Sequence, residues 1–236
     1  MIEGPTLLRE ALAATVPLTD VFVTPDADEG LVTDASARGA VVRWVTADVL
    51  ARAVDTVTPQ GVAAIARRID VTVDDAVAAA AVGPLALVLV DVADPGNAGT
   101  LLRAAEAAGA AAVLFCGGSV DPCNPKCVRA SAGALFHLPV AIGGEAEAVL
   151  ERLGEAGVRT AATVVRGGTP YDEADLAGPL AIVLGSEAHG LAAGLVEAID
   201  LRLTIPMAGR SESLNVAMAG SVLCFESLRQ RRNAAR

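Results

Sequence analysis

The segment that most constrains the fold is residues 85–92, LALVLVDV, which is apolar at every position but one. A strand with one solvated face alternates apolar and polar residues, whereas a strand covered on both faces is apolar throughout. Further strands are expected at 112–115, 159–164, 181–184 and 201–205, with helix-like stretches between them. This alternation predicts an α/β fold in which helices cover both sides of a parallel sheet.

The N-terminal part has shorter elements. The elements expected there are a helix at 6–14, strands at 20–23 and 41–45, and a further element at 61–66. They predict a small α/β domain over residues 1–70. Residues 71–84 are rich in Ala and Asp and end in Gly83-Pro84, so they are interpreted as a linker. The sheet-forming domain then covers residues 85–236.

Composition and the pattern at the N-terminus narrow the class of protein. A hydrophobic fraction of 53% with 3% aromatic residues means that Ala, Val and Leu fill the core, which is typical of an α/β protein. The longest uncharged apolar run, 76–90, is shorter than the roughly 20 residues that cross a bilayer, so no membrane span is expected. The first residues lack the pattern of a secretory signal, and a cytoplasmic location is expected.

A metal site is not expected from the cysteines. The cysteines are Cys116, Cys123, Cys127 and Cys224. Zinc sites usually combine two CxxC-like pairs or add histidines, and the only histidines are His137 and His189. Free, reduced thiols are therefore expected.

The formal net charge of −10 argues against a protein that coats nucleic acid non-specifically, because phosphate affinity needs clustered Lys and Arg. A local basic face is compatible with this charge. The arginines gathered at the C-terminal end are Arg229, Arg231, Arg232 and Arg236. A solvated helix end would give the same pattern.

The first segment that can carry chemistry is DPGNAGTLLR at 94–103, after the strand expected at 85–92. Asn97 is expected to cap the following helix, and Gly99 to let a partner approach its backbone closely. Arg103 then projects from the second helical turn, beyond the carboxyl end of a strand, where open α/β sheets bind ligands. A helix cap followed by a surface arginine would look the same.

The second segment, AIVLGSEAHG at 181–190, is a strand that runs into a glycine-containing loop with Glu187. Such a loop exposes backbone donors and acceptors to a flat ligand such as adenine. Neither this loop nor the one that contains Gly96 and Gly99 is GxGxxG, which argues against a dinucleotide-binding Rossmann enzyme.

The third segment, LTIPMAGRSESLNVAM at 203–218, is a strand that stops at Pro206, a polar loop and the start of a helix. Ser211 or Ser213 is expected to cap that helix. Asn215 is expected in its first turn, where an amide serves better to hold a ligand or a neighbouring loop than to pack. The positions with the spacing of a buried helix face are Leu214, Ala217, Met218, Val222, Phe225 and Leu228.

Together, and in this order, the three segments resemble the three motifs of the SpoU (TrmH-like) branch of the SPOUT methyltransferases: NxGxxxR, LGxExxGL and IPMxGxxxSLNVAxA. The stretch between the first two, with Lys126, Arg129 and Ser131, is also similar, so the resemblance covers about residues 85–228. Residues 1–70 resemble the L30e-like RNA substrate-binding domain that is often fused to these enzymes.

The resemblance implies an RNA ribose 2′-O-methyltransferase that uses S-adenosylmethionine. It also implies a SPOUT domain with a deep trefoil knot, which ordinary topology rules disfavour. The implied partners are RNA, with rRNA favoured over tRNA, and a second copy of the chain in a homodimer. Relatives with this N-terminal module commonly carry a basic segment before the residues that match Glu3-Gly4-Pro5, and this chain begins at Met1, so reduced RNA affinity is expected.

The resemblance also implies roles for residues. The catalytic residues it implies are Arg103, Asn97, Glu187, Ser213 and Asn215. The residues it implies in contact with the cofactor are Leu184, Gly185, Ile205, Met207 and Leu214. A guanidinium is a poor base because it keeps its proton up to about pH 12, so Arg103 is interpreted as orienting the ribose and its phosphate unless its environment is unusual. His189 is the rival base because imidazole titrates near neutrality.

Two other functions stay open at this level. A binding protein of the same fold would hold RNA or a ribosomal surface without catalysis, although the complete motifs argue against it. A nucleotide-binding oxidoreductase of Rossmann type would need the glycine fingerprint that this chain lacks.

Overall fold

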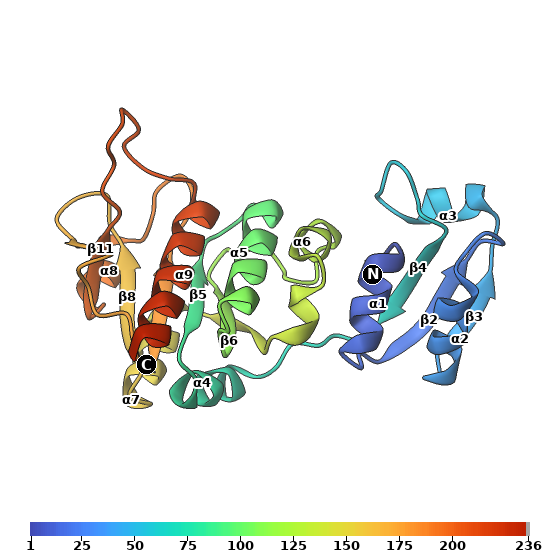
Figure 1. Ribbon diagram of the computed structural model, residues 1–236, viewed down its shortest axis with the longest axis horizontal. Helices are drawn as coiled ribbons and strands as arrows, with labels where there is room; N and C mark the ends of the chain where they lie inside the picture. The colour runs from blue at the N-terminus through green and yellow to red at the C-terminus, as the bar shows by residue number, and fades with distance from the viewer. Residues whose placement is uncertain (235–236) are drawn as a thin grey trace.

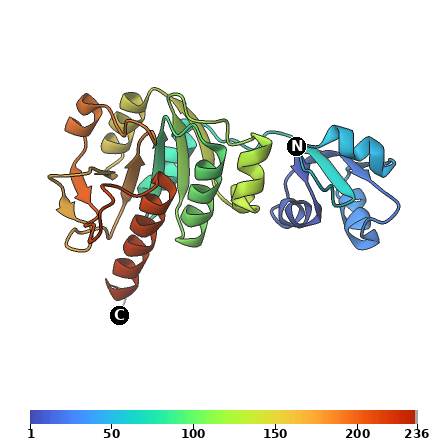
Figure 2. The same ribbon diagram turned by 90° about the horizontal axis from the view of Figure 1, so that it is seen from above.

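The computed structural model describes residues 1–234 as two lobes lying end to end, each built on its own sheet (Figures 1 and 2). Arg236, the last of the basic residues near the C-terminus, lies outside the described residues. The N-terminal lobe contains β1 (Ile2–Glu3), α1 (Pro5–Ala13), β2 (Leu18–Val23), α2 (Glu29–Ala37), β3 (Val41–Trp44), α3 (Ala47–Ala53) and β4 (Val62–Ala66).

The sheet of the N-terminal lobe has the strand order β1-β4-β2-β3. Strand β4 runs antiparallel to both β1 and β2, and β2 runs parallel to β3. Helix α2 begins where the side chain of Asp28 accepts a hydrogen bond from the Leu31 amide, and Thr46 caps α3 in the same way. The lobe is therefore the small α/β module that its sequence predicts.

The second lobe is a parallel sheet with helices on both faces. Its first elements are α4 (Val73–Val82), β5 (Ala86–Val90), α5 (Pro95–Ala107), β6 (Ala112–Cys116), α6 (Pro125–Ser131), the 3₁₀ helix η1 (Ala134–His137) and β7 (Val140–Gly144). The others are α7 (Ala146–Glu155), β8 (Arg159–Thr163), β9 (Thr169–Pro170), β10 (Leu180–Leu184), α8 (Ala193–Glu197), β11 (Leu201–Thr204) and α9 (Val216–Ala234).

The apolar run at β5 is buried on both faces, as its composition predicts. Leu87 and Leu89 join the core formed with α5, α6 and α9, whereas Ala86, Val88 and Val90 join a second core formed with α4, α7 and α8. The two cores lie on opposite faces of one sheet because successive side chains of a strand alternate between its faces. The predicted α/β fold with a parallel sheet is confirmed.

The seven strands follow the spatial order β7-β6-β5-β10-β8-β11-β9, and every described pair in this sheet is parallel. The chain builds outward from β5 to β7 and then continues on the other side of β5. Strands β5 and β10 are thus neighbours although they are distant in the sequence. Ligands bind open α/β sheets at such a reversal, outside the carboxyl ends of the strands.

The linker expected over residues 71–84 is wrong in its main part. Residues 73–82 form α4, whose buried residues Ala76, Val77 and Ala80 pack into the core beside α7. Thr72 caps this helix by accepting a hydrogen bond from the Asp75 amide. An Ala-rich and Asp-rich stretch fits a capped helix as well as a linker, and only burial on the sheet distinguishes the two.

Two residues of the last helix are not core residues. Ala217 is buried as its spacing predicts, but Met218 is 61% exposed and Phe225 is 49% exposed. The apolar spacing thus describes a stripe wider than the face that α9 packs against the sheet. Among residues 1–234, no helix is long and apolar enough to cross a membrane.

Candidate active site

The three motif segments meet at the carboxyl edge of the second sheet. The first follows β5, the second follows β10 and the third follows β11. Strands β5 and β10 are adjacent, and β8 separates β10 from β11. Helix α9 returns over α5 and β10 so closely that a Cβ on Gly220 would lie 2.3 Å from Leu101 and 2.7 Å from Leu184. This packing brings the third segment back beside the first.

The start of α5 differs from the sequence prediction. Asp94 caps the helix, because its carboxylate accepts a hydrogen bond from the Asn97 amide at 2.8 Å. The expected cap, Asn97, lies instead in the first turn. Its side chain is therefore free to make contacts outside the helix.

Asn97 joins the other two motif segments through its side-chain amide. Its Nδ2 donates to Glu187 Oε1 at 2.9 Å, and its Oδ1 accepts from Asn215 Nδ2 at 3.0 Å. The amide of Asp94 also donates to Glu187 Oε1, at 3.4 Å. One continuous chain of hydrogen bonds thus links the loops after β5, β10 and β11.

Asn215 also caps α9. Its Oδ1 accepts hydrogen bonds from the amides of Ala217 at 2.9 Å and Met218 at 3.3 Å. Neither Ser211 nor Ser213 makes this contact, so the predicted serine cap is wrong. Because its oxygen satisfies the helix end and its nitrogen bonds Asn97, the orientation of the Asn215 amide is fixed.

Glu187 is the anionic end of this chain of hydrogen bonds. Burial by itself raises the pKa of Glu187, but hydrogen bonds from the Asn97 side chain and from nearby backbone amides outweigh burial and lower that pKa overall. The carboxylate therefore stays charged at neutral pH and acts as an acceptor that orients Asn97.

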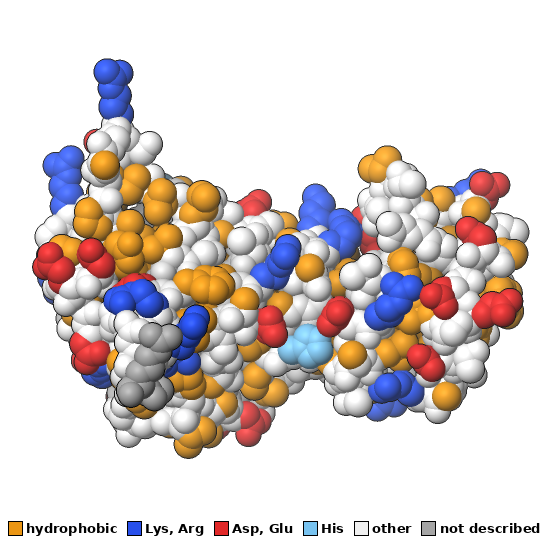
Figure 3. Space-filling view, viewed as in Figure 1, with side chains coloured by type: hydrophobic (Ala, Val, Ile, Leu, Met, Phe, Trp, Pro, Cys, Tyr) orange, Lys and Arg blue, Asp and Glu red, His pale blue; other side chains and the backbone are white. Residues whose placement is uncertain are grey.

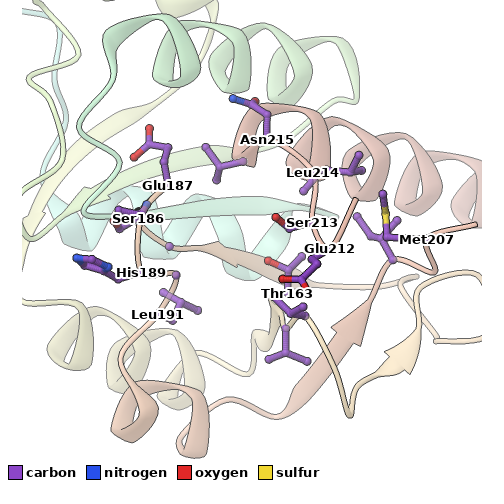
Figure 4. A pocket seen from close by; sticks show the side chains of 18 residues that line it. Thr163, Ser186, Glu187, His189, Leu191, Met207, Glu212, Ser213, Leu214 and Asn215 are labelled. Carbon is purple, nitrogen blue, oxygen red and sulfur yellow. Dashed lines mark hydrogen bonds between the residues drawn. The ribbon is translucent and has the colours of Figure 1, made fainter. Parts of the chain in front are cut away.

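Beside this network lies a cavity of about 540 Å³. In Figure 4 the loop with Ser186, Glu187 and His189 forms one side, and Ser213, Leu214 and Met207 lie across from it. Gly185 is needed where the first loop folds back on itself, since a Cβ there would lie 2.4 Å from the carbonyl carbon of Gly190. Ligand pockets usually measure roughly 300–1,000 Å³, so the cavity can hold a cofactor of nucleoside size.

Four of the five residues expected at the cofactor line this cavity, and one does not. Those that line it are Gly185, Ile205, Met207 and Leu214. Leu184 is fully buried and is absent from the lining. Its side chain packs toward Gly220 of α9.

The residues expected to be catalytic are divided between the cavity and its edge. Glu187, Ser213 and Asn215 line the cavity, whereas Asn97 reaches it only through its hydrogen bonds. Arg103 is exposed on α5 outside the lining, and no side chain among residues 1–234 pairs with it. His189, the rival base, does line the cavity.

Sequence reasoning missed the part of the cavity that follows β8. Thr163, Val164 and Val165 line it there, and Glu212 lines it from the third segment. The available signal was positional, because β8 is a predicted strand whose carboxyl end lies on the ligand-binding edge. It could not be used without knowing that β8 lies between β10 and β11.

The cysteines lie away from this cavity. Burial raises the pKa of Cys116, Cys127 and Cys224 to about 12, so these thiols stay protonated. Among residues 1–234, no group of three His, Cys, Asp or Glu residues could hold a metal ion.

Comparison with known proteins identifies the family. Residues 84–225 match the SpoU rRNA Methylase family. The chain belongs to this family. Residues 1–71 match the domain described as RNA 2′-O ribose methyltransferase substrate binding. The predicted family and the predicted enzyme class, an RNA 2′-O-methyltransferase, are thereby confirmed, and the SpoU enzyme has both its catalytic and its substrate-binding domain.

Named relatives cover most of the SpoU chain. The 23S rRNA (guanosine(2553)-2′-O)-methyltransferase RlmP of Bacillus subtilis is 33% identical over 225 residues, which are 95% of this chain and 86% of the relative. The 23S rRNA (guanosine-2′-O-)-methyltransferase RlmB of Ralstonia nicotianae is 38% identical over 148 residues, 63% of this chain and 59% of the relative.

Solved structures share both lobes. The AdoMet-bound rRNA methyltransferase from Sinorhizobium meliloti superposes with a TM-score of 0.84 at 30% identity, covering 96% of this chain and 85% of that one. AviRb from Streptomyces viridochromogenes, at 23% identity, shares the fold with a TM-score of 0.86, covering 99% of this chain and 90% of that one. The predicted SPOUT fold class is confirmed, and its knot is consistent with these neighbours. The predicted cofactor, S-adenosylmethionine, agrees with the AdoMet in the Sinorhizobium enzyme.

Proposed function

We propose that this SpoU enzyme transfers the methyl group of S-adenosylmethionine to a ribose 2′-hydroxyl of ribosomal RNA. The observation that carries the proposal is the hydrogen-bonded chain of Glu187, Asn97 and Asn215, which joins all three motif segments beside the cavity. Ribosomal RNA is favoured over tRNA because the two named relatives act on 23S rRNA. A cytoplasmic location belongs to the same proposal, since ribosomal RNA is made and assembled there in bacteria.

The cavity suits the methyl donor. Its lining combines apolar side chains, Ile205, Met207 and Leu214, with the exposed backbone of the loop after Gly185. The apolar side chains can pack against the face of a flat base, and the backbone groups of the loop can form hydrogen bonds with its edge. When bound, S-adenosylmethionine supplies a methyl group carried on a positively charged sulfur.

Arg103 is proposed to hold the RNA. Its guanidinium is exposed and has no side-chain partner among residues 1–234, so its donors are available to a phosphate or to the 2′-oxygen. The same helix carries Asn97, which ties its first turn to Glu187. Placement of the hydroxyl in line with the methyl group then supplies much of the catalysis. The 2′-oxygen would gain the methyl group as the bond between the methyl carbon and the sulfur breaks, and the hydroxyl proton would pass to solvent.

The homodimer is proposed to form over α9. Met218 and Phe225 expose apolar surface there. A hollow of about 250 Å³ nearby is lined by Phe225, Leu228, Arg229, Arg232 and Asn233. Burying exposed apolar side chains on a second copy would remove them from water. Light scattering at micromolar concentration should give twice the mass of one chain, and a monomer would contradict this part of the proposal.

Methyl transfer tests the function directly. Purified protein is incubated with ribosomal RNA and with tRNA in the presence of methyl-labelled S-adenosylmethionine, and the 2′-O-methyl positions are mapped. Label at one or a few riboses of ribosomal RNA is the expected result. RNA binding without incorporated label would favour the non-catalytic alternative, and label in tRNA alone would overturn the assignment of the substrate.

A further inference from the structure

We propose that Glu3 and Arg129 are positioning residues that hold the substrate-binding lobe in one fixed orientation against α6. RNA bound by that lobe would then meet the active site in a constant register. The docking itself stands on the geometry below, and only its effect on methylation rests on the proposed function.

Glu3 is bonded to both lobes at once. It ends β1, and its side chain is 5% exposed. Within its own lobe the carboxylate accepts hydrogen bonds from the Thr56 hydroxyl and, at 3.3 Å, from the Asp55 amide. From the other lobe it accepts a hydrogen bond from Arg129 Nη1 at 2.9 Å. Glu3 therefore connects the loop before β4 to helix α6.

The contact between the lobes depends on the negative charge of Glu3. Burial raises the pKa of Glu3, but the hydrogen bonds from Thr56 and Asp55 and the pairing with Arg129 outweigh burial and lower that pKa overall. A buried carboxylate is costly unless it is paired. If the lobes separated, Glu3 would keep its local hydrogen bonds but lose its only cationic partner among residues 1–234.

Helix α1 makes a second contact between the lobes. Glu10 of α1 pairs with His137 of η1, with 2.9 Å between Glu10 Oε2 and His137 Nε2. Gly133, just before η1, lies so close to α1 that an added Cβ would be 2.5 Å from Glu10 Cγ. The two lobes thus touch along a surface that includes both β1 and α1.

The covalent connection between the lobes is short and anchored at each end. The Arg67 amide donates to the Pro17 carbonyl in the first lobe, and the Val71 amide donates to the Val140 carbonyl in the second. Three residues lie between these anchors. One of them, Arg68, pairs with Asp121 of the second lobe at 3.3 Å. A tether of this length leaves the lobes little freedom once Glu3 and Arg129 pair.

The docked helix is rigidly joined to the active site. Where α6 crosses α5, a Cβ on Gly99 would lie 2.4 Å from the Cβ of Ala130 and 2.7 Å from the carbonyl oxygen of Cys127. Close backbone packing of this kind resists relative motion. An orientation fixed on α6 is therefore also fixed relative to Arg103 on α5. In Figure 3, Lys and Arg side chains gather at the waist between the lobes, where RNA spanning both lobes would pass.

The chain contains one tryptophan, Trp44, which lies in the substrate-binding lobe and reports its rotation. Time-resolved fluorescence anisotropy of the full-length protein should show the slow rotation of the whole particle. Glu3→Gln should add a faster component of the size of one lobe. The glutamine oxygen can still accept from the Asp55 amide and its NH2 group can donate to the Thr56 hydroxyl, but the charge that pairs with Arg129 is lost. Arg129→Gln should do the same from the other lobe, and the double variant should match either single one.

The matched control is Glu29→Gln, which changes the same residue type at an exposed position of the same lobe, with no side-chain partner among residues 1–234. It should behave as the parent. In methylation assays, Glu3→Gln should raise the KM for ribosomal RNA about tenfold or more, with kcat within about twofold of the parent. Its affinity for S-adenosylmethionine should not change.

The proposal would be overturned if the anisotropy decay of the parent already contained a fast component of the size expected for one lobe. It would also be overturned if the Glu3→Gln and Arg129→Gln proteins had the same anisotropy decay and the same KM as the parent. A fall in kcat with an unchanged KM would also contradict it, because that result would place Glu3 in the chemical step. Failure of the proposed function looks different. The parent would then transfer no methyl group to RNA while its anisotropy still showed a single slow rotation.

Discussion

Gly185→Ala should weaken binding of S-adenosylmethionine without unfolding the protein. The added Cβ would lie 2.4 Å from the carbonyl carbon of Gly190 and 2.5 Å from the Leu191 nitrogen, where ordinary contact begins at 3.4 Å. Both atoms belong to the backbone, so the whole loop after β10 must move by about 1 Å. Overpacking of this kind typically costs about 1–3 kcal/mol. If binding requires the original loop position, the dissociation constant should rise about 5- to 150-fold.

Isothermal titration with S-adenosylmethionine measures this effect, and thermal unfolding shows whether the variant is folded. The matched control is Gly194→Ala in α8, where an added Cβ meets no atom within 4 Å. That variant should bind the cofactor as the parent does. A folded Gly185→Ala protein with parental affinity would refute the assignment of this loop to the cofactor.

Two further predictions test the roles of single side chains. Arg103→Ala should lower the rate of single-turnover methylation about 100-fold or more. The dissociation constant for S-adenosylmethionine should stay within a few-fold of the parent's, because Arg103 lies outside the cavity. If His189→Ala were the inactive variant instead, His189 would be the base. Asp200→Ala should lower the free energy of unfolding by about 1 kcal/mol, because Asp200 accepts two hydrogen bonds from Thr160 but is exposed to solvent. These hydrogen bonds lower the pKa of Asp200 below its ordinary value of 3.8, so this stabilisation is present at neutral pH and is lost as the pH falls through the lowered value. Urea unfolding at pH 7 and pH 3 measures it. The control Asp172→Ala should have little effect, because Asp172 is exposed and its side chain makes no hydrogen bond or ion pair among residues 1–234.

Local sequence patterns predicted the strands β5, β6, β8, β10 and β11 but missed β7 and β9, and they predicted the helix caps poorly. An apolar run such as 85–92 has few alternatives to burial on both faces, and the structure places β5 there. Caps depend on which of several nearby polar side chains reaches the free amides. Asp94 does so in place of Asn97, and Asn215 in place of Ser211 or Ser213. The candidates were present in the sequence, but their geometry was not.

The sequence by itself determined which segments meet at the candidate active site. The three motif segments follow three predicted strands, and parallel strands place their carboxyl ends at one edge of the sheet. Glu187, Asn215 and four of the expected cofactor residues are found at the cavity for that reason. The sequence alone likewise predicts that both faces of the sheet are covered by helices, because its strands are apolar at successive positions.

Only the tertiary structure decided which of these residues touch. Asn97 bonds Glu187 across 90 residues of sequence because β10 lies next to β5 out of sequence order. It bonds Asn215 across 118 residues because α9 packs back over α5. The pairing of Glu3 with Arg129 spans 126 residues and joins two separately folded sheets. The physical reason is that a side-chain contact depends on the positions of both backbones. Those positions are fixed by the packing of the whole sheet and its helices, which no local pattern records.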